Sequence, residues 1–371
     1  MKILLFSNTS WYFVKFRKNL IKSFLNQGWK VFVIASRDST TEKLIELGCN
    51  VIIIPIDRKS LNPIKSLLFI FNIIKIFLRI KPDVICNSTI KPVIYGSFVA
   101  TILRIPTINC ITGLGTIFIH YDYLKNFVQW LYKISLKKVY RVFFENSDDR
   151  DLFINKQLVK KTITDVLPGS GVDLNHFSLT EYEKSKEINL LLISRIIADK
   201  GINEFVESAK IIKKKYNNVN FKILGPIDLN YKYSISPEKL KSWVQEKNII
   251  YLGVAEDVRP YIKNAQCIIL PSYREGLPNC LLESASMGRP IITTDVEGCR
   301  EVVENGFNGF LCKSKDSKDL ADKIEVFLSL SHDKMKLMGL NGRKKVEEKF
   351  NENIIIEKYL KTIKEISSSN L

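Results

Sequence analysis

The chain has 371 residues, of which 46% are hydrophobic and 26% are charged. This composition is typical of a folded protein and leaves room for two domains of ordinary size, each with its own core. Only three histidines are present, which excludes a histidine-rich metal site, and the seven cysteines form no Cys-x-x-Cys pair. We therefore expect reduced thiols and a cytoplasmic protein.

The formal net charge is +17, and it is concentrated in the first half of the chain. Residues 1–165 hold 25 lysines and arginines against 11 acidic residues, whereas residues 166–371 hold 31 against 28. Such a basic domain is typical of a protein that contacts a polyanion, either a nucleic acid or an anionic membrane leaflet. No stacking motif or recognised nucleic-acid-binding fold accompanies the charge, so we expect a membrane surface and no nucleic acid.

The first half alternates apolar runs with helix-compatible segments, which predicts an open parallel sheet of an α/β domain. The first run is too short for the core of a signal peptide and is predicted to be a buried strand. The expected strands are residues 2–6, 30–35, 50–54, 82–86, 106–111 and 139–144. Ligands bind beyond the carboxyl ends of such strands, where Lys91, Thr112 and Gly113 lie and where His120 follows.

The segment 62–80 is very apolar, and Lys65, Lys75 and Arg79 interrupt it. As a helix it would be shorter than about 30 Å, so we do not expect it to cross a bilayer. Two interpretations stay open. It is either a core helix of the α/β domain or a helix that lies in an anionic membrane interface, which the flanking cations favour.

The segment 165–173 combines the end of a strand with Pro168 and two glycines, which predicts a crossing between domains. Strands are then expected at 188–193, 221–224, 249–252 and 266–270, with a helix at 202–215 and helices between the later strands. Arg195 and Lys200 lie in the loop after the first of these strands. Residues after 312 are predicted to be helical to about residue 366.

The stretch from residue 266 to residue 294 predicts a strand, a loop, a helix and a second strand. Pro278 stands where a first helical residue is expected, and Gly288 can end the helix. The first N–H groups of such a helix have no intrahelical partner and can bind a phosphate. Glu275 lies at the mouth of this loop and Glu283 about one turn into the helix. By their spacing alone they could equally be solvated surface residues.

Several motifs in the second half together resemble the donor site of retaining glycosyltransferases of family 4. They are Ser-Tyr-Arg-Glu-Gly-Leu-Pro from Ser272, Glu-Ser-Ala-Ser-Met-Gly-Arg-Pro from Glu283, Thr-Asp-Val-Glu-Gly-Cys-Arg-Glu from Thr294 and Asn-Gly-Phe-Asn-Gly from Asn305. The resemblance implies the GT-B architecture, an α/β fold with two Rossmann-like domains facing a cleft. It implies an acceptor-binding domain over 1–168, joined by a final helix (353–371) that crosses back, and a nucleotide-sugar-binding domain over 169–352.

The resemblance also implies roles for residues that match the family motifs. Arg195 and Lys200 would neutralise the nucleotide diphosphate, Glu275 would contact the transferred sugar and Glu283 would bind the ribose. The remaining donor-binding residues that we expect are Gly276, Leu277, Pro278, Asn279 and Val254. Residues 7–12 depart from the glycine-rich loop that many members carry there, which puts a donor-phosphate contact at this loop in doubt.

Loops of the first half resemble those of bacterial sugar transferases that assemble O-antigen, capsule and lipid-linked glycans. The resemblance implies Lys91, Thr112 and Gly113 as acceptor-binding residues and His120 as a candidate functional histidine. The expected substrates are a UDP-hexose or UDP-N-acetylhexosamine and a polyprenyl-diphosphate-linked glycan. The expected enzyme is peripheral on the inner face of the cell membrane, retains the anomeric configuration, and needs no metal or other cofactor.

Two other functions are compatible with the same fold. A nucleotide-sugar 2-epimerase would need acid and base groups in the cleft, and the chain offers few histidines and no paired-carboxylate motif. A non-catalytic basic protein that binds membranes or nucleic acid would be favoured by loss of Arg195, Lys200, Glu275 or Glu283. All four residues are present.

Overall fold

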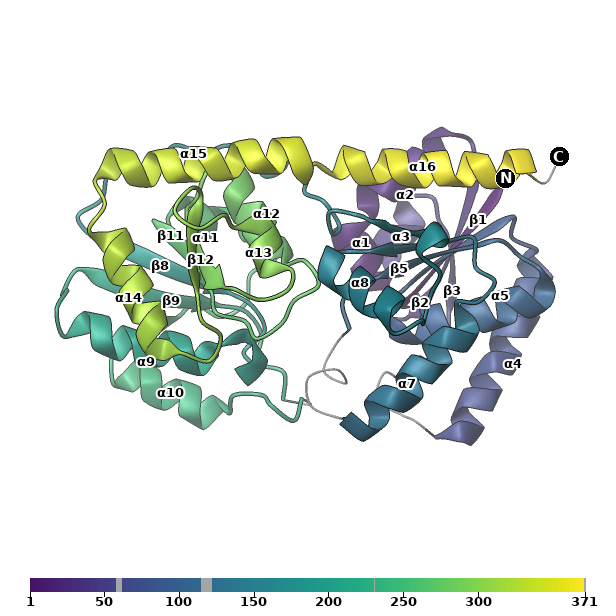
Figure 1. The fold of residues 1–371 in the computed structure, drawn as a ribbon, viewed down its shortest axis with the longest axis horizontal. Coiled ribbons are helices and arrows are strands. Elements are labelled where there is room, and N and C mark those ends of the chain that lie inside the picture. Colours follow the sequence, from purple (N-terminus) through teal and green to yellow (C-terminus); the bar gives the residue numbers. More distant parts are fainter. Residues whose placement is uncertain (58–61, 115–121, 230, 370–371) are drawn as a thin grey trace. The chain divides into compact units, whose positions relative to one another are not determined.

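The computed structural model describes residues 1–57, 62–114, 122–229 and 231–369 (Figure 1). These residues form two compact units, one made of Met1–Ser170 with Asn353–Leu371 and the other of Gly171–Glu352. Each unit is built on one parallel β-sheet with helices on both faces. The chain passes between the units next to Gly169 and Gly171, whose φ angles of 63° and 70° suit glycine.

The first unit contains a seven-stranded parallel sheet of the order β3-β2-β1-β4-β5-β6-β7. Its strands are β1 (Lys2–Thr9), β2 (Lys30–Ser36), β3 (Asn50–Ile53), β4 (Val84–Ser88), β5 (Thr107–Ile111), β6 (Arg141–Phe144) and β7 (Thr164–Val166). Its α-helices are α1 (Ser10–Phe16), α2 (Lys18–Asn26), α3 (Thr41–Glu46), α4 (Pro63–Ile80), α5 (Ser97–Leu103), α7 (Asp122–Ser135), α8 (Ser147–Asn155) and α16 (Glu352–Ser369). A π-helical turn, η1 (Pro92–Gly96), leads into α5.

Alternate residues of β1 point to opposite faces of this sheet, as strand geometry requires. Ile3 and Leu5 pack in a core with α2, α3 and α16. Leu4 and Phe6 pack in a second core with the inner sides of α4 and α5. Since crossovers between parallel strands are right-handed, the helices that precede β4, β5 and β6 cover one face of the sheet, which places α4, α5 and α7 in one layer.

Between the first two strands, the structure has two helices, α1 and α2, which are separated by a break at Arg17 (φ −134°, ψ 12°). The Arg17 side chain is 3% exposed. Its guanidinium lies 3.8 Å from Glu145 Oε1 and donates to Cys110 Sγ at 3.6 Å. A buried charge needs such a partner, so tertiary contacts set this break rather than local helix propensity.

The second unit contains a six-stranded parallel sheet of the order β10-β9-β8-β11-β12-β13. Its strands are β8 (Ile188–Ile193), β9 (Val219–Leu224), β10 (Ile250–Tyr251), β11 (Cys267–Leu270), β12 (Ile291–Thr294) and β13 (Gly309–Cys312). Its α-helices are α9 (Ile202–Lys213), α10 (Pro237–Gln245), α11 (Arg259–Lys263), α12 (Asn279–Ser286), α13 (Cys299–Val302), α14 (Ser317–Leu328) and α15 (His332–Lys349). Alternation along β11 sends Cys267 and Ile269 into one core and Ile268 and Leu270 into the other.

Candidate active site

The second sheet has a topological switch point between β8 and β11. The chain leaves β8 towards β9 and β10, and then returns to add β11 on the other side of β8. The loops after β8 and β11 therefore diverge at the carboxyl edge, where open α/β sheets bind ligands. Lys200 lies in the 3-10 turn after β8 (η3, Ala198–Lys200), and Glu275 lies in the loop after β11.

The structure joins these two side chains directly. Lys200 Nζ donates a hydrogen bond to Glu275 Oε1 and forms an ion pair with it. The two side chains are 20% and 11% exposed, so the pair is largely withdrawn from solvent. A cation and a carboxylate thus lie side by side at the switch point, where the ammonium group can bind an anionic part of a ligand and the carboxylate can accept hydrogen bonds from its hydroxyl groups.

The N-terminus of α12 follows this pair in the chain. Pro278 is the N-cap residue of α12 (φ −75°), so the prediction that it would be the first helical residue is off by one position. The backbone N–H groups of Asn279 and Cys280 form no hydrogen bond within the described part of the chain. The Leu277 side chain is 4% exposed and belongs to the core. Leu277 can therefore contribute only its backbone to an anion site, where the N–H groups of Asn279 and Cys280 lie.

Two carboxylates surround the beginning of α12. Burial raises the pKa of the Cys280 thiol, and the charges of Glu275 and Glu283 raise it further. Both glutamates therefore act electrostatically on the first turn of the helix, and Glu283 itself is only 7% exposed. The Cys280 thiol stays protonated at neutral pH and is no nucleophile.

The loop after β12 supports the loop that carries Glu275. Gly298 has a φ of 75°, and a Cβ atom there would lie 2.3 Å from Gly276 O. The Glu275 N–H donates to Glu297 O at 3.3 Å, and Arg274 pairs with the Glu297 carboxylate at 3.2 Å. This role of Gly298 was not predicted from the sequence. The pattern that could have indicated it is a glycine in a polar turn directly after a buried strand.

Arg195 lies at the same edge of the sheet but has a different partner. Its guanidinium pairs with Asp228 Oδ2 at 3.0 Å and lies 5.8 Å from the centre of the Tyr231 ring. Tyr231 Oη donates to Asp199 Oδ2 at 2.5 Å, which ties the loop after β9 to η3. Among the described residues, no hydrogen bond or ion pair joins Arg195 to Glu275. Asp228 and Tyr231 were not predicted as site residues, although they follow the buried strand β9 at this edge.

Val254, which was predicted to line the donor site, follows β10 at the carboxyl edge and is 67% exposed. Within the described ranges, no group of three or more histidine, cysteine, aspartate or glutamate side chains could hold a metal ion.

The candidate acceptor residues lie at the carboxyl edge of the first sheet. The switch point of that sheet lies between β1 and β4, where the Asn8 N–H donates to Thr89 Oγ1 at 3.2 Å. Lys91 Nζ donates to the carbonyl oxygen of Asp57, and burial lowers its pKa. Thr112 and Gly113 follow β5 at the same edge. His120 lies outside the described residues.

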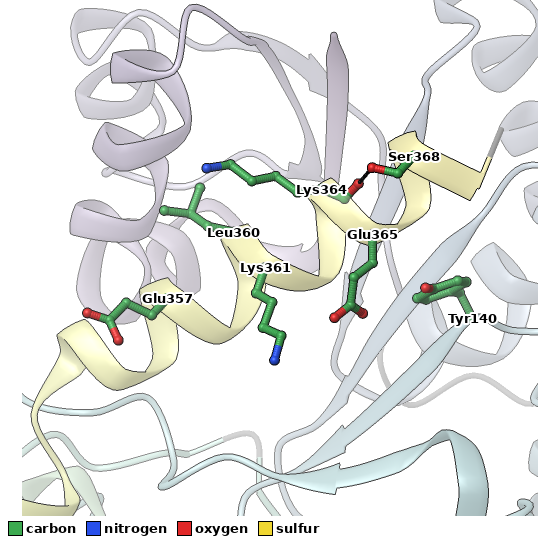
Figure 2. A pocket seen from close by; sticks show the side chains of 7 residues that line it. All are labelled: Tyr140, Glu357, Leu360, Lys361, Lys364, Glu365 and Ser368. Atoms are coloured by element: carbon green, nitrogen blue, oxygen red, sulfur yellow. Dashed lines mark hydrogen bonds between the residues drawn. The ribbon is translucent and has the colours of Figure 1, made fainter. Parts of the chain in front are cut away.

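A cavity of about 750 Å³ in the first unit lies elsewhere (Figure 2). It is lined by Tyr140 and by side chains from residues 357–368 of α16. Because Tyr140 directly precedes β6, this cavity is at the amino edge of the sheet, opposite to the acceptor candidates. It is not part of the candidate site.

Comparison with known proteins assigns both halves of the chain to described families. Residues 2–146 match the model "Glycosyl transferase 4-like" and residues 175–345 match "Glycosyl transferases group 1". The second match contains Lys200, Glu275, Glu283 and the loop of Gly298.

Among curated proteins, the chain is 32% identical over 363 residues to the N,N'-diacetylbacillosaminyl-diphospho-undecaprenol alpha-1,3-N-acetylgalactosaminyltransferase of Campylobacter jejuni, covering 93% of this chain and 94% of that protein. It is 24% identical to the Escherichia coli UDP-Gal:alpha-D-GlcNAc-diphosphoundecaprenol alpha-1,3-galactosyltransferase, with coverage of 88% and 86%.

Solved structures share the fold at low identity. A glycosyltransferase from Rickettsia africae superposes with a TM-score of 0.78 at 18% identity, covering 98% of each chain. Anabaena HepE in complex with UDP and glucose superposes with a TM-score of 0.77 at 16% identity, covering 98% of this chain and 99% of that one. The predicted GT-B fold is confirmed.

Proposed function

Since the chain belongs to the glycosyltransferase family that these two models describe, we propose that it moves a hexose or N-acetylhexosamine from a UDP-sugar to a polyprenyl-diphosphate-linked glycan. The observation that carries the donor half of this proposal is the Lys200–Glu275 pair, placed at the switch point next to the open N-terminus of α12. Among the described residues, the other two ion pairs at this edge, Arg195–Asp228 and Arg274–Glu297, do not join the loop after β8 to the loop after β11.

The donor diphosphate fits the N-terminus of α12 and Lys200. The N–H groups of Asn279 and Cys280 would donate hydrogen bonds to phosphate oxygens, next to the N–H of Gly276, and the positive end of the helix dipole would attract the negative charge. Charge builds up on the diphosphate as the bond to the sugar breaks, so a fixed ammonium group stabilises the transition state. Arg195 is half-exposed and would exchange Asp228 for a phosphate oxygen.

The two glutamates would recognise the sugar and the nucleoside. Glu275 would accept hydrogen bonds from hydroxyl groups of the transferred sugar, and Glu283 from the ribose. In the reaction, the bond between the anomeric carbon and the phosphate oxygen breaks, and the acceptor oxygen bonds to that carbon. The acceptor proton passes to the departing phosphate on the same face, so the anomeric configuration is retained and no side chain acts as the base. The positive charge that the diphosphate needs would come from Lys200 and Arg195 rather than from a metal.

The acceptor proposal rests on the relatives and on the first unit. The names of both curated relatives contain a diphospho-undecaprenol or diphosphoundecaprenol acceptor. Lys91, Thr112 and Gly113 would bind the corresponding diphosphate at the edge of the first sheet. Among the residues that the structure describes, no helix is long and apolar enough to span a bilayer. Because the acceptors named for both relatives are linked to undecaprenol, a membrane lipid, we propose peripheral association with the inner face of the cell membrane, through the basic first unit.

The test is a donor screen with matched variants. UDP-GalNAc, UDP-GlcNAc, UDP-Gal and UDP-Glc are each incubated with a membrane extract, and release of UDP and transfer of labelled sugar are measured. Glu275→Gln and Lys200→Ala should each lower kcat by about 10²- to 10³-fold with the active donor. The controls are Glu207→Gln and Lys210→Ala, which break an exposed ion pair of the same composition on α9.

Near-wild-type turnover by Glu275→Gln or Lys200→Ala, with controls unchanged, would remove the donor-site assignment. Inversion of the anomeric configuration in the product, measured by NMR, would remove the same-face mechanism while leaving the donor site in place.

A further inference from the structure

The outer surface of the layer formed by α4, α5 and α7 exposes an unusual amount of apolar area. On α4, Ile64, Leu67, Leu68 and Phe71 are 57–67% exposed, at the spacing of one helical face. Their stripe continues through Lys75, Leu78 and Arg79, all of which are exposed. The opposite face of α4 supplies Ile73, Phe77 and Ile80 to the core. The helix is thus a core helix on one side and an exposed apolar helix on the other.

The two neighbouring helices extend this surface (Figure 1). Phe98 and Ile102 on α5 are 39% and 57% exposed. On α7, Phe127, Trp130 and Ile134 are exposed at helical spacing, and the rings of Phe127 and Trp130 stack with centroids 6.0 Å apart. We call the ten exposed apolar residues of these three helices the apolar face: Ile64, Leu67, Leu68, Phe71, Leu78, Phe98, Ile102, Phe127, Trp130 and Ile134. Soluble proteins rarely leave so many large apolar side chains together in water.

Cations border the apolar face. Lys75 and Arg79 on α4 and Lys133 on α7 are exposed and form no ion pair with any residue that the structure describes. Lys81 and Arg104, at the C-terminal ends of α4 and α5, are exposed as well. The three helices contain a single acidic residue, the first residue of α7.

We infer that the apolar face docks onto an anionic lipid bilayer, with the apolar side chains among the acyl chains and the cations at the headgroups. Charge complementarity selects this occupant. A second copy of the same face would bring like charges together, and a nucleic acid would leave the aliphatic side chains of α4 without partners. A face of apolar residues bordered by lysine and arginine is the pattern of interfacial membrane helices.

This inference identifies the surface through which the proposed membrane association takes place. It rests on the proposed function in one respect, which is that a lipid-linked acceptor explains why the protein binds a membrane. The lipid-linked acceptor would then be met in the plane of the bilayer. Vesicle binding is measured without donor or acceptor, so its failure and the failure of the proposed function are distinguishable.

The experiment is co-sedimentation of the full chain with vesicles of phosphatidylcholine containing 30% phosphatidylglycerol, compared with pure phosphatidylcholine. Phe71→Ala/Trp130→Ala should weaken binding at least tenfold, and Lys75→Gln/Arg79→Gln about 25-fold at low salt, at about fivefold per cation. The controls are Leu337→Ala and Lys241→Gln/Lys318→Gln, which change exposed residues of the second unit and should bind like the wild type. Melting temperatures are compared to show that each variant is folded.

Three outcomes would overturn the inference. The first is that the wild type does not bind the anionic vesicles, and the second is that both double variants bind them as the wild type does. The third is that sedimentation velocity shows a dimer and that Phe71→Ala/Trp130→Ala dissociates it. The expected result includes one further difference. Transfer to a short-chain, water-soluble acceptor stays unchanged in Phe71→Ala/Trp130→Ala, whereas transfer to a long-chain acceptor in vesicles falls.

Discussion

Replacing Gly298 with alanine should disable the donor site and leave the second unit folded. The new Cβ atom would lie 2.3 Å from Gly276 O and 2.9 Å from Glu275 O, closer than real Cβ atoms approach other atoms. The loop that carries Glu275 must therefore move by about 1 Å. A displacement of about 1 Å can cost about 100-fold in rate, or about 2.7 kcal/mol of transition-state stabilisation.

Gly306→Ala is the matched control. Gly306 has a φ of 80°, close to the 75° of Gly298, but a Cβ atom there would meet nothing within 4 Å. Both variants should lose about 1–2 kcal/mol of folding free energy, because alanine disfavours positive φ. Only Gly298→Ala also crowds the loop of Glu275.

The assay is kcat/KM for release of UDP, together with UDP binding by calorimetry and thermal unfolding by circular dichroism. We expect both variants to melt a few degrees below the wild type and only Gly298→Ala to lose about 100-fold in kcat/KM. A kcat/KM for Gly298→Ala within threefold of that for Gly306→Ala would refute the reasoning, because it would show that the packing of these two loops does not set the catalytic geometry.

Two further variants test the charges around the two sheets. Asp228→Asn should lower KM for the nucleotide sugar by up to about fivefold, since Arg195 no longer has to leave a half-exposed ion pair worth about 1 kcal/mol or less; a raised KM in steady-state kinetics would show that Asp228 positions Arg195 instead. Burial raises the pKa of Glu145 from 4.5 to about 7, so the folded protein binds a proton here that the unfolded chain has already lost. The stability gained from this proton is complete below about pH 4.5 and is lost as the pH rises through about 7. Glu145→Gln should therefore flatten the fall of melting temperature with pH, and an unchanged slope between pH 5 and pH 8 would show that Glu145 does not cause it.

The fold could be predicted because its strands are buried on both faces and read as apolar runs. Residues 188–193 coincide with β8, and the other expected strands differ from the observed ones by one to three residues at their ends. The break between α1 and α2 could not be predicted. It depends on Arg17 meeting Glu145, which lies more than 120 residues later and follows a different strand.

That Lys200 and Glu275 lie close together could be predicted from the sequence, since both follow strands whose carboxyl ends meet at one edge of a parallel sheet. Arg195 was expected beside the same ligand, but its ion pair with Asp228 depends on the path of the loop after β9. That loop contains no apolar periodicity from which a path could be derived. The close approach of Gly298 to Gly276 likewise depends on two loop conformations, and no one-dimensional pattern encodes it.

The last helix has a consequence for the order in which the protein folds during synthesis. Ile355, Tyr359 and Ile363 of α16 are at most 2% exposed and complete the core of the first unit, and Lys358 Nζ bonds Asp165 Oδ2 at 2.9 Å. At a ribosomal rate of about 5–20 residues per second, these side chains emerge on the order of ten to forty seconds after β7. The unit that starts first is thus the one that finishes last. Until then its sheet keeps an uncovered apolar strip, which is a natural substrate for a chaperone.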